Sequence, residues 1–416
     1  MVPKEWINVS LGDVITYKKG FAFDSSNFQS HGVQIIRISD TTSNSISLKN
    51  PIYVSKEVAA KLTAFIVHEG DIVLSTVGSR PHLVDSMVGK AVRIPKETEE
   101  SLLNQNLVKL IPKKSVIIND YLYLMVKKSR FIYFISTLIR GNANQVSITL
   151  KELFKYKFPL PPLIEQKKIT QILSTWDKAI TTTEKLLVNS EQQKKALVQQ
   201  LLTGKKRFPT DVSSWRDYAL SEIFEFKKGK GLSKGVIACT GKKKCILYGE
   251  LYTKYNEVIK AVFSRTHSND GFPSKYGDVL VPCSTTTSGI DLAKATALFE
   301  NDVLLGGDIN VLRPKISVDS AFISYLLTHV KKNEIASRAQ GITIIHLYGS
   351  DLKSLNVTIP ASLSDQQKIA SVFSTADQEI EKLKQKLDCL KQEKKALMQQ
   401  LLTGKRRVKV AEISDD

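Results

Sequence analysis

The sequence is poor in cysteine and in long apolar runs. Its 416 residues include only four cysteines, with irregular spacing and no Cys-x-x-Cys pair, which argues against a disulfide framework and a common zinc site. The longest apolar stretch, around Phe131 to Ile139, is far shorter than the roughly 20 residues that a membrane-spanning helix needs. The amino-terminal segment lacks the basic start and apolar centre of a secretory signal. We therefore expect a cytoplasmic protein with reduced cysteines and no membrane partner.

Recognisable catalytic motifs are missing as well. No phosphate-binding loop of the form G-x-x-x-x-G-K-[ST] occurs, and the Asn/Asp-Pro-Pro-aromatic signature of amino methyltransferases is absent. The six histidines show no metal-ligand spacing. The run from Gly231 to Gly235 matches the nucleophile motif G-x-S-x-G, but the pattern indicates neither the strand before it nor the helix after it that the motif requires. We expect no catalytic and no metal-ligating residues in this chain.

Positive charge, in contrast, is abundant. The chain has 60 Lys and Arg residues against 41 Asp and Glu residues, a formal net charge of +19. Such a balance favours a polyanionic partner, and nucleic acid is the leading candidate. The length and a hydrophobic content of 42% are sufficient to bury a large core, so we expect two or more domains.

An internal repeat organises the chain. Residues 165–205 align without a gap to residues 365–405, and 20 of the 41 positions are identical. Trp6, Leu11 and the Lys18-Lys19-Gly20 run recur 209 positions later, at the start of the second half. A Gly-Asp pair at Gly70 also has a weaker counterpart at Gly277. The order is therefore variable domain, repeated segment, variable domain, repeated segment.

The repeated segments have the pattern of long helices. In the second copy, apolar residues recur at alternating spacings of three and four from Ile369 to Leu401, interrupted only by Lys394. Gly204 and Gly404 are placed as carboxyl-terminal caps. A helix of about 40 residues is roughly 60 Å long. The link to Trp215, about ten residues, spans at most roughly 35 Å. We therefore expect the second domain near the far end of the first helix, with the second helix returning antiparallel.

The interiors of the two halves are rich in short strand-like runs, such as Val33 to Ile38 and Gly277 to Val281. One helical run precedes each repeat, at Asp120 to Leu138 and at Ser320 to Ala339. The predicted fold class is α+β: two tandem α/β domains joined by two long antiparallel coiled-coil helices, with a pseudo-two-fold internal repeat. The predicted boundaries are 1–158, first domain; 159–208, first helical spacer; 209–358, second domain; and 359–416, second spacer with a basic tail.

Two groups of residues are candidates for contacts. Lysine and arginine side chains can supply phosphate contacts, and base-edge contacts in the major groove supply sequence choice. The DNA-binding candidates are Lys18, Lys19, Arg37, Arg80, Lys90, Lys227, Lys228, Lys230 and Arg265. Polar as well as seam residues are retained between the two helical copies, which we interpret as a docking face. The docking candidates are Gln166, Ile169, Leu197, Gln200, Leu201, Gln366, Ile369, Leu397, Gln400 and Leu401.

These repeated segments resemble the conserved regions of type I restriction-modification specificity subunits. The resemblance is carried by residues 158–169 with the run Leu201-Leu202-Thr203-Gly204-Lys205, and by residues 365–369 with the run Leu401 to Arg407. The second copy departs from the usual Pro-Pro-x-x-Glu-Gln form, since it reads Pro360-Ala361-Ser362-Leu363-Ser364-Asp365-Gln366. In layout the resemblance covers the whole chain.

The resemblance implies a non-catalytic subunit with two target recognition domains, each reading one half of a split DNA sequence, and a helical pair that sets the gap. It also implies double-stranded DNA, two methylation subunits and restriction subunits as partners. S-adenosylmethionine, ATP and Mg would then belong to the partner subunits and not to this chain.

Three alternatives stay open at this stage. The chain could be a coiled-coil adaptor that binds DNA without sequence preference. It could be the specificity subunit of a related system in which nuclease and methyltransferase share one polypeptide. It could also be a nuclease or methyltransferase with an unrecognised site. Cutting or methylation of DNA by the purified chain alone would support the last of these.

Overall fold

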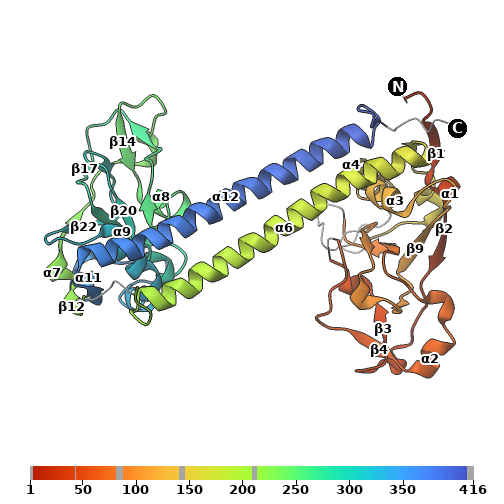
Figure 1. The fold of residues 1–416 in the computed structure, drawn as a ribbon, viewed down its shortest axis with the longest axis horizontal. Helices are drawn as coiled ribbons and strands as arrows, with labels where there is room; N and C mark the ends of the chain where they lie inside the picture. Colours follow the sequence, from red (N-terminus) through yellow and green to blue (C-terminus); the bar gives the residue numbers. More distant parts are fainter. Residues whose placement is uncertain (1–2, 43, 81–87, 140–145, 209–212, 410–416) are drawn as a thin grey trace. The chain divides into compact units, whose positions relative to one another are not determined.

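The computed structural model describes residues 3–42, 44–80, 88–139, 146–208 and 213–409. The chain divides into two compact units, one of residues 1–181 and 388–416 and the other of residues 182–387. Each unit contains one globular domain of mixed strands and helices together with parts of two long helices (Figure 1). The expected α+β class is confirmed.

The domain of the first unit is built from short strands and helices. Its strands are β1 (Ile7–Ser10), β2 (Ile15–Lys19), β3 (Val33–Ile36), β4 (Ile52–Val54), β5 (Ile72–Ser75), β6 (Val77–Gly78), β7 (Ala91–Arg93), β8 (Leu102–Leu103), β9 (Leu107–Pro112), β10 (Val146–Ser147) and β11 (Lys157–Leu160). Its helices are α1 (Leu11–Val14), α2 (Lys56–Ala60), α3 (Asn119–Val126), α4 (Ser129–Leu138) and α5 (Leu150–Leu153). The sheets run in the orders β2-β9-β5-β7, β4-β3-β8, β1-β11 and β10-β6.

The domain of the second unit uses the same plan. Its strands are β12 (Trp215–Ala219), β13 (Phe224–Lys228), β14 (Lys243–Ile246), β15 (Val258–Ile259), β16 (Arg265–Thr266), β17 (Phe272–Pro273), β18 (Asp278–Pro282), β19 (Ser284–Thr285), β20 (Thr296–Leu298), β21 (Leu304–Leu305), β22 (Ile309–Pro314), β23 (Ile345–His346) and β24 (Asn356–Pro360). Its helices are α7 (Leu220–Ile223), α8 (Tyr248–Thr253), α9 (Ser320–Tyr325), the π-helical segment Leu326–Val330, α10 (Lys332–Ala336) and α11 (Gly349–Lys353).

Each sheet of the first domain has a counterpart in the second. The order β2-β9-β5-β7 recurs as β13-β22-β18-β20, to which the second domain adds β15 at the edge. The pairs β1-β11 and β10-β6 recur as β12-β24 and β19-β23, and the parallel pair β3-β8 recurs as β14-β21. The duplication therefore extends to the interiors, where the sequences have diverged most.

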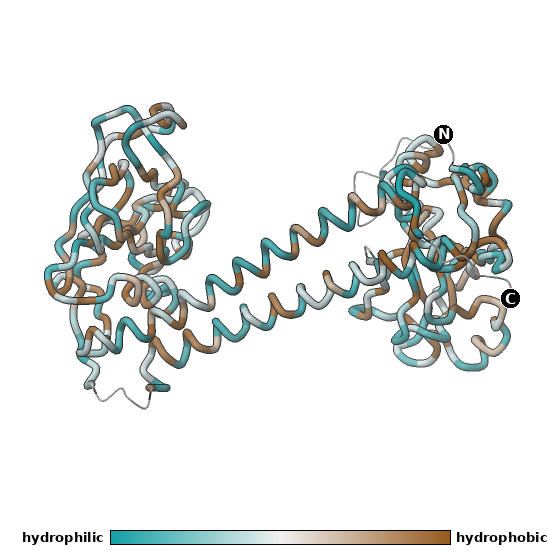
Figure 2. Tube along the Cα trace, turned by 45° about the horizontal axis from the view of Figure 1, so that its top comes forward, coloured by the Kyte–Doolittle hydropathy of each residue, from teal (hydrophilic) through white to brown (hydrophobic). Residues whose placement is uncertain are grey.

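The two long helices occupy equivalent positions in the repeat. α6 spans Leu163–Leu201 and α12 spans Leu363–Leu401, an offset of 200 residues at both ends. Gly204 and Gly404 adopt φ angles of 69° and 70°, which suits the left-handed turn after a helix and favours glycine there. Apolar and polar residues alternate along both helices (Figure 2). Within the described ranges, no helix has both the length and the apolar character required to cross a lipid bilayer.

The helices pair in antiparallel fashion within each unit. In the second unit, Lys194 of α6 contacts Asp377 of α12. In the first unit, Asp177 of α6 contacts Lys394 of α12. In the second unit, Glu191 of α6 also pairs with Lys384 of α12, so the residue number falls along α6 as it rises along α12, which is the signature of antiparallel packing. The predicted orientation of the second helix is confirmed.

The helical run expected before each repeat is interrupted in both domains. Between α3 and α4, Lys128 leaves the helical conformation with a ψ of 142° and begins the next helix. In the second domain, α9 is followed directly by the π-helical segment, and Lys331 then separates that segment from α10. The expected single helices at Asp120–Leu138 and Ser320–Ala339 are therefore wrong in their continuity, because apolar periodicity does not reveal a local break.

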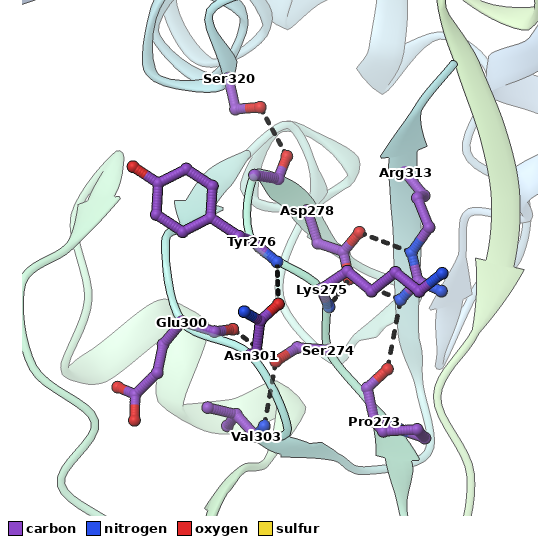
Figure 3. A network of polar contacts seen from close by, with 11 residues as sticks. Pro273, Ser274, Lys275, Tyr276, Asp278, Glu300, Asn301, Val303, Arg313 and Ser320 are labelled. Carbon is purple, nitrogen blue, oxygen red and sulfur yellow. Dashed lines mark hydrogen bonds and ion pairs between the residues drawn. The ribbon is translucent and has the colours of Figure 1, made fainter.

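The repeated Gly-Asp pair forms a polar turn at one end of β18 (Figure 3). Asp278 is fully buried and accepts two hydrogen bonds from Arg313, at 2.9 and 2.8 Å. It also accepts one from the backbone N–H of Lys275, and Ser320 Oγ donates to the carbonyl of Gly277. The guanidinium of Arg313 thus compensates the charge that burial would otherwise penalise.

This turn generates a stability prediction. We expect Asp278→Ala to destabilise the chain by about 3–5 kcal/mol, because it leaves the guanidinium of Arg313 without its carboxylate. Glu334→Ala is the matched control, since it removes an ion pair with Lys331 whose carboxylate is exposed to water, and it should cost about 0.5 kcal/mol or less. Urea unfolding of both variants measures the difference, and equal losses would contradict the role given to the turn.

Candidate nucleic-acid interface

The Lys-Lys-Gly run ends an equivalent strand in each domain. β2 ends at Lys19 and β13 ends at Lys228, and the next residue is a glycine in both. A Cβ atom at Gly20 would lie 2.0 Å from the carbonyl oxygen of Asn104, and one at Gly229 would lie 1.9 Å from that of Gly306. Glycine is therefore required for the backbone to cross at this point. This close backbone contact fixes the position of the two lysines that precede each glycine.

The predicted DNA-binding residues fall into three groups. Those with exposed side chains are Lys19, Arg80, Lys228, Lys230 and Arg265. Two others are half-buried: Lys18 lies 4.7 Å above the ring of Phe65, and Lys227 pairs with Glu225. The side chains of the exposed group face water, where a phosphate can approach them.

Two of the predicted DNA-binding residues use their side chains for contacts within the domain. Lys90 is only 3% exposed, and its ammonium group donates to the carbonyl of Thr41 at 2.9 Å. Arg37 makes a two-pronged contact with Asp40 and donates to the carbonyl of Asn50. The expectation that Lys90 contacts DNA is corrected, because a buried ammonium cannot meet a phosphate. Arg37 would first have to break its pair with Asp40.

The glutamine that recurs near the start of each long helix holds that helix to its own domain. Gln166 is fully buried; it accepts from the N–H of Ile118 and donates to the carbonyls of Val116 and Pro161. Gln366 is 2% exposed; it accepts from the N–H of Asp319 and donates to the carbonyl of Pro360. These amides satisfy backbone groups at an internal junction and so dock each helix to its own domain, and a role of theirs toward a partner stays a prediction.

The other docking candidates divide by exposure. Ile169, Leu201, Ile369 and Leu401 are buried in the apolar clusters of their own units, and Leu197 and Leu397 pack against those clusters. Gln200 and Gln400 are exposed. Only these two glutamines of the predicted set are thus free to meet a partner without rearrangement of the core.

A buried polar cluster joins the helix pair to the domain in the second unit. Lys194 Nζ lies 2.6 Å from Asp377 Oδ1 and 3.8 Å from Glu257 Oε2, and it is 14% exposed. Tyr325 donates its hydroxyl to Asp377, and His329 Nε2 lies 2.7 Å from Glu257. Burial alone would raise the pKa of Glu257, but the His329 hydrogen bond and the charge of Lys194 outweigh it and lower the pKa to about 2.

The equivalent pair in the first unit is more open to water. Lys394 contacts Asp177, whose side chain is 54% exposed. Burial also lowers the pKa of the neighbouring Lys127 to about 8, with smaller contributions from Lys90 and Lys394. One sequence position in the repeat therefore carries a buried ion pair in one unit and a solvated ion pair in the other.

A hollow of about 820 Å³ opens beside β19 in the second domain. Its lining combines hydroxyl groups, charged groups and apolar groups, and includes Tyr248, Tyr252, Thr285, Thr287, Ile290, Asp291, Lys294, Asp308, Lys332, Ile344 and His346. A second hollow of about 460 Å³ shares Tyr248 and Asp308 with it and continues to Gly231. None of the predicted DNA-binding residues lines this hollow, although the Thr-Thr-Thr-Ser run after a buried strand is a sequence signal for it.

The shared frame relates this hollow to a predicted residue of the first domain. Arg80 lies two positions after β6, and Thr287 lies two positions after β19, the counterpart of β6. Arg80 therefore occupies the place that a lining residue of the hollow occupies in the second domain. Among the described residues, no three His, Cys, Asp or Glu side chains gather closely enough to hold a metal ion.

Comparisons with known proteins agree with this arrangement. The model of the type I restriction modification DNA specificity domain matches twice, at residues 3–190 and 212–392. The MjaX type I restriction enzyme specificity subunit of Methanocaldococcus jannaschii is 25% identical, with 98% of this chain and 95% of that protein covered.

Two solved structures share the fold. The type I restriction-modification S subunit of M. genitalium has a TM-score of 0.62, 16% identity and 96% coverage of both chains. A chain from a study of complex assembly and conformational transition in the type I R-M system has a TM-score of 0.55, 15% identity, and coverage of 98% of this chain and 100% of that one.

The two lysines of the helix seam generate a matched pair of predictions. We expect Lys194→Met to cost about 3–5 kcal/mol, because it leaves Asp377 buried without a cation, whereas Glu257 keeps its contact with His329. The equivalent Lys394→Met should cost about 1 kcal/mol or less, because Asp177 remains hydrated. Urea unfolding measures both. The assignment fails if the two variants lose the same stability.

Glu257 generates a pH prediction. Its pKa is about 2 in the folded chain and near 4.5 in the unfolded chain, so its contribution is fully present above pH 4.5 and is lost as the pH falls towards 2. The stability advantage of the wild type over Glu257→Gln should therefore shrink across that window. Unfolding at a series of pH values measures the difference, and a gap that stays constant would contradict the shift.

Proposed function

This chain belongs to the type I restriction modification DNA specificity family, and we propose that each of its two domains reads one half of a bipartite DNA target. Its part in such a system is that of the sequence-specificity subunit, which is not catalytic. The observation that carries the proposal is that each sheet of the first domain has a counterpart in the second. Two domains with one frame and different loops offer two related but distinct binding faces.

Lysine and arginine side chains at the exposed positions would supply the affinity. Lys19 in the first domain and Lys228 in the second follow from the same Lys-Lys-Gly run, and both are exposed. Phosphate contacts of this kind position a protein on DNA without reading its sequence. Sequence choice must then come from other groups in each domain.

The long helices would dock the partner proteins. We propose two methylation subunits and the restriction subunits as partners, with the exposed Gln200 and Gln400 on the docking face. S-adenosylmethionine, ATP and Mg would be held by those subunits. The cytoplasm, where the DNA is, is the expected location. One structural relative comes from work on assembly of the type I R-M system, which supports the choice of partners.

Methylation mapping tests the proposal directly. DNA is sequenced by a single-molecule method from cells that carry this chain with its methylation partner, and from cells that lack only this chain. We expect a split motif with methylated adenine in both parts in the first case and its loss in the second. An unchanged methylome, with the complex assembled and active on control DNA, would overturn the proposal and support an adaptor without sequence preference.

The helix pair generates a separate prediction about the gap. Insertion of one heptad into both α6 and α12 lengthens each by about 10 Å, which corresponds to about three base pairs of DNA. Seven residues also nearly complete two turns, so the seam keeps its orientation. We therefore expect the unspecified gap to widen by up to about three base pairs while both half-sites keep their sequences. Methylation mapping of the variant measures this, and altered half-sites with an unchanged gap would refute it.

A further inference from the structure

A hydrogen-bonded hairpin contributes Ile344 and His346 to the lining of the hollow in the second domain. Gln340 and His346 exchange two backbone hydrogen bonds, of 2.8 and 2.7 Å, and β23 pairs with β19 beside the central sheet. Gly341 has a φ of 124°, and a Cβ atom there would lie 2.1 Å from the carbonyl oxygen of Ile344. The turn therefore requires glycine at this position. We call residues 340–346 the finger.

The tip of the finger is apolar and faces water. Ile342 is 98% exposed, and every residue from Gly341 to Ile344 is exposed. Ile344 also lines the hollow, together with the exposed Tyr248 and Ile290. A single exposed isoleucine needs no explanation, whereas exposed apolar side chains that gather around one hollow are typical of interaction sites.

The surroundings of the tip suit DNA. Lys294 and Lys332 line the hollow, and Lys230 directly precedes Gly231 of the adjoining hollow. Thr287, Asp308 and His346 supply donors and acceptors within the lining. The exposed ammonium groups of Lys230 and Lys332 match phosphates, polar groups match base edges, and an aliphatic tip matches the methyl group of thymine.

The strand pair that supports the finger recurs in the first domain, but the sequence of the tip does not. β6 pairs with β10 in the first domain as β19 pairs with β23 in the second. The residues before β23 read Ala-Gln-Gly-Ile-Thr-Ile, whereas those before β10 read Arg-Gly-Asn-Ala-Asn-Gln and lie outside the described residues. One frame thus carries an apolar sequence in one copy and a polar sequence in the other, as two different half-sites demand.

We propose that the finger reads bases in the second half-site, and that Ile342 contacts the methyl group of a thymine in the major groove. The inference rests on the proposed function and adds to it the reading element, the base and the atom that is recognised. A β-hairpin is narrow enough to enter the major groove.

The first test is methylation mapping of Ile342→Ser in the assembled complex with the methylation partner. We expect the requirement for one A·T pair in the second half-site to relax, while the first half-site and the gap stay unchanged. Ile316→Ser is the control. Ile316 is 41% exposed and follows the last residue of β22, whereas Asp308, which lines the hollow, precedes the first. The methylated motif should therefore be retained in this variant. Because Ile342 makes no core contact, its replacement leaves folding intact.

The second test uses the wild-type complex and duplexes in which thymine is replaced by uracil at the position identified by mapping. Loss of the methyl contact should weaken binding roughly four-fold. Ile342→Ser should bind both duplexes equally, with the affinity of the wild type for the uracil duplex.

The outcomes separate this proposal from the proposed function. If the wild-type complex methylates no split motif, the proposed function fails. If it does, but Ile342→Ser keeps the same motif, or the wild type binds both duplexes equally, only the finger assignment is overturned. Weakened assembly with the methylation subunit at an unchanged motif would also overturn it and would make the finger a protein-binding element.

Discussion

Each long helix carries a lysine in its apolar seam, and each lysine must find a carboxylate on the other helix. The seam lysines Lys194 and Lys394 are 200 positions apart, as are the aspartates Asp377 and Asp177 that receive them. The contact of one unit therefore recurs in the other with the roles of the helices exchanged, as in an isologous interface. A polar residue in a helical seam stabilises little by itself, but it penalises other registers. A shift by one heptad would place Lys194 opposite Ala370 or Lys384, and neither is a partner for an ammonium group.

The same constraint explains why polar residues survive in the repeat. Gln166 and Gln366 tie the start of each helix to backbone groups of its own domain, and Lys194 and Lys394 tie the helices together. These contacts are the joints of the frame. The loops beyond the joints have diverged, which is the pattern expected when a scaffold is retained and its binding surfaces change.

The sequence was sufficient for the architecture because the repeat encodes it twice. α6 and α12 begin two residues before the repeated segments 165–205 and 365–405 and end four residues before the last residue of each, and Gly204 and Gly404 follow the helices with positive φ angles. The internal contacts of Lys90 and Arg37 could not be predicted from the sequence. The groups that bind them, the Thr41 carbonyl and the Asp40 carboxylate, are placed by the tertiary fold. The same holds for Gln166, whose burial depends on backbone groups about 50 residues away.

Exposure, and not residue type, therefore decides which side chains remain candidates for DNA. Lys18 and Lys19 are neighbours on β2, yet only Lys19 projects freely, since Lys18 packs over Phe65. Lysines of this kind attract any duplex and cannot by themselves distinguish two half-sites. Discrimination requires groups whose chemistry differs between the domains while their support does not. The paired strands β6-β10 and β19-β23 provide that support in both copies, and the segments they carry differ in polarity. A duplicated frame with divergent tips can thus bind two unlike sequences with the same phosphate contacts.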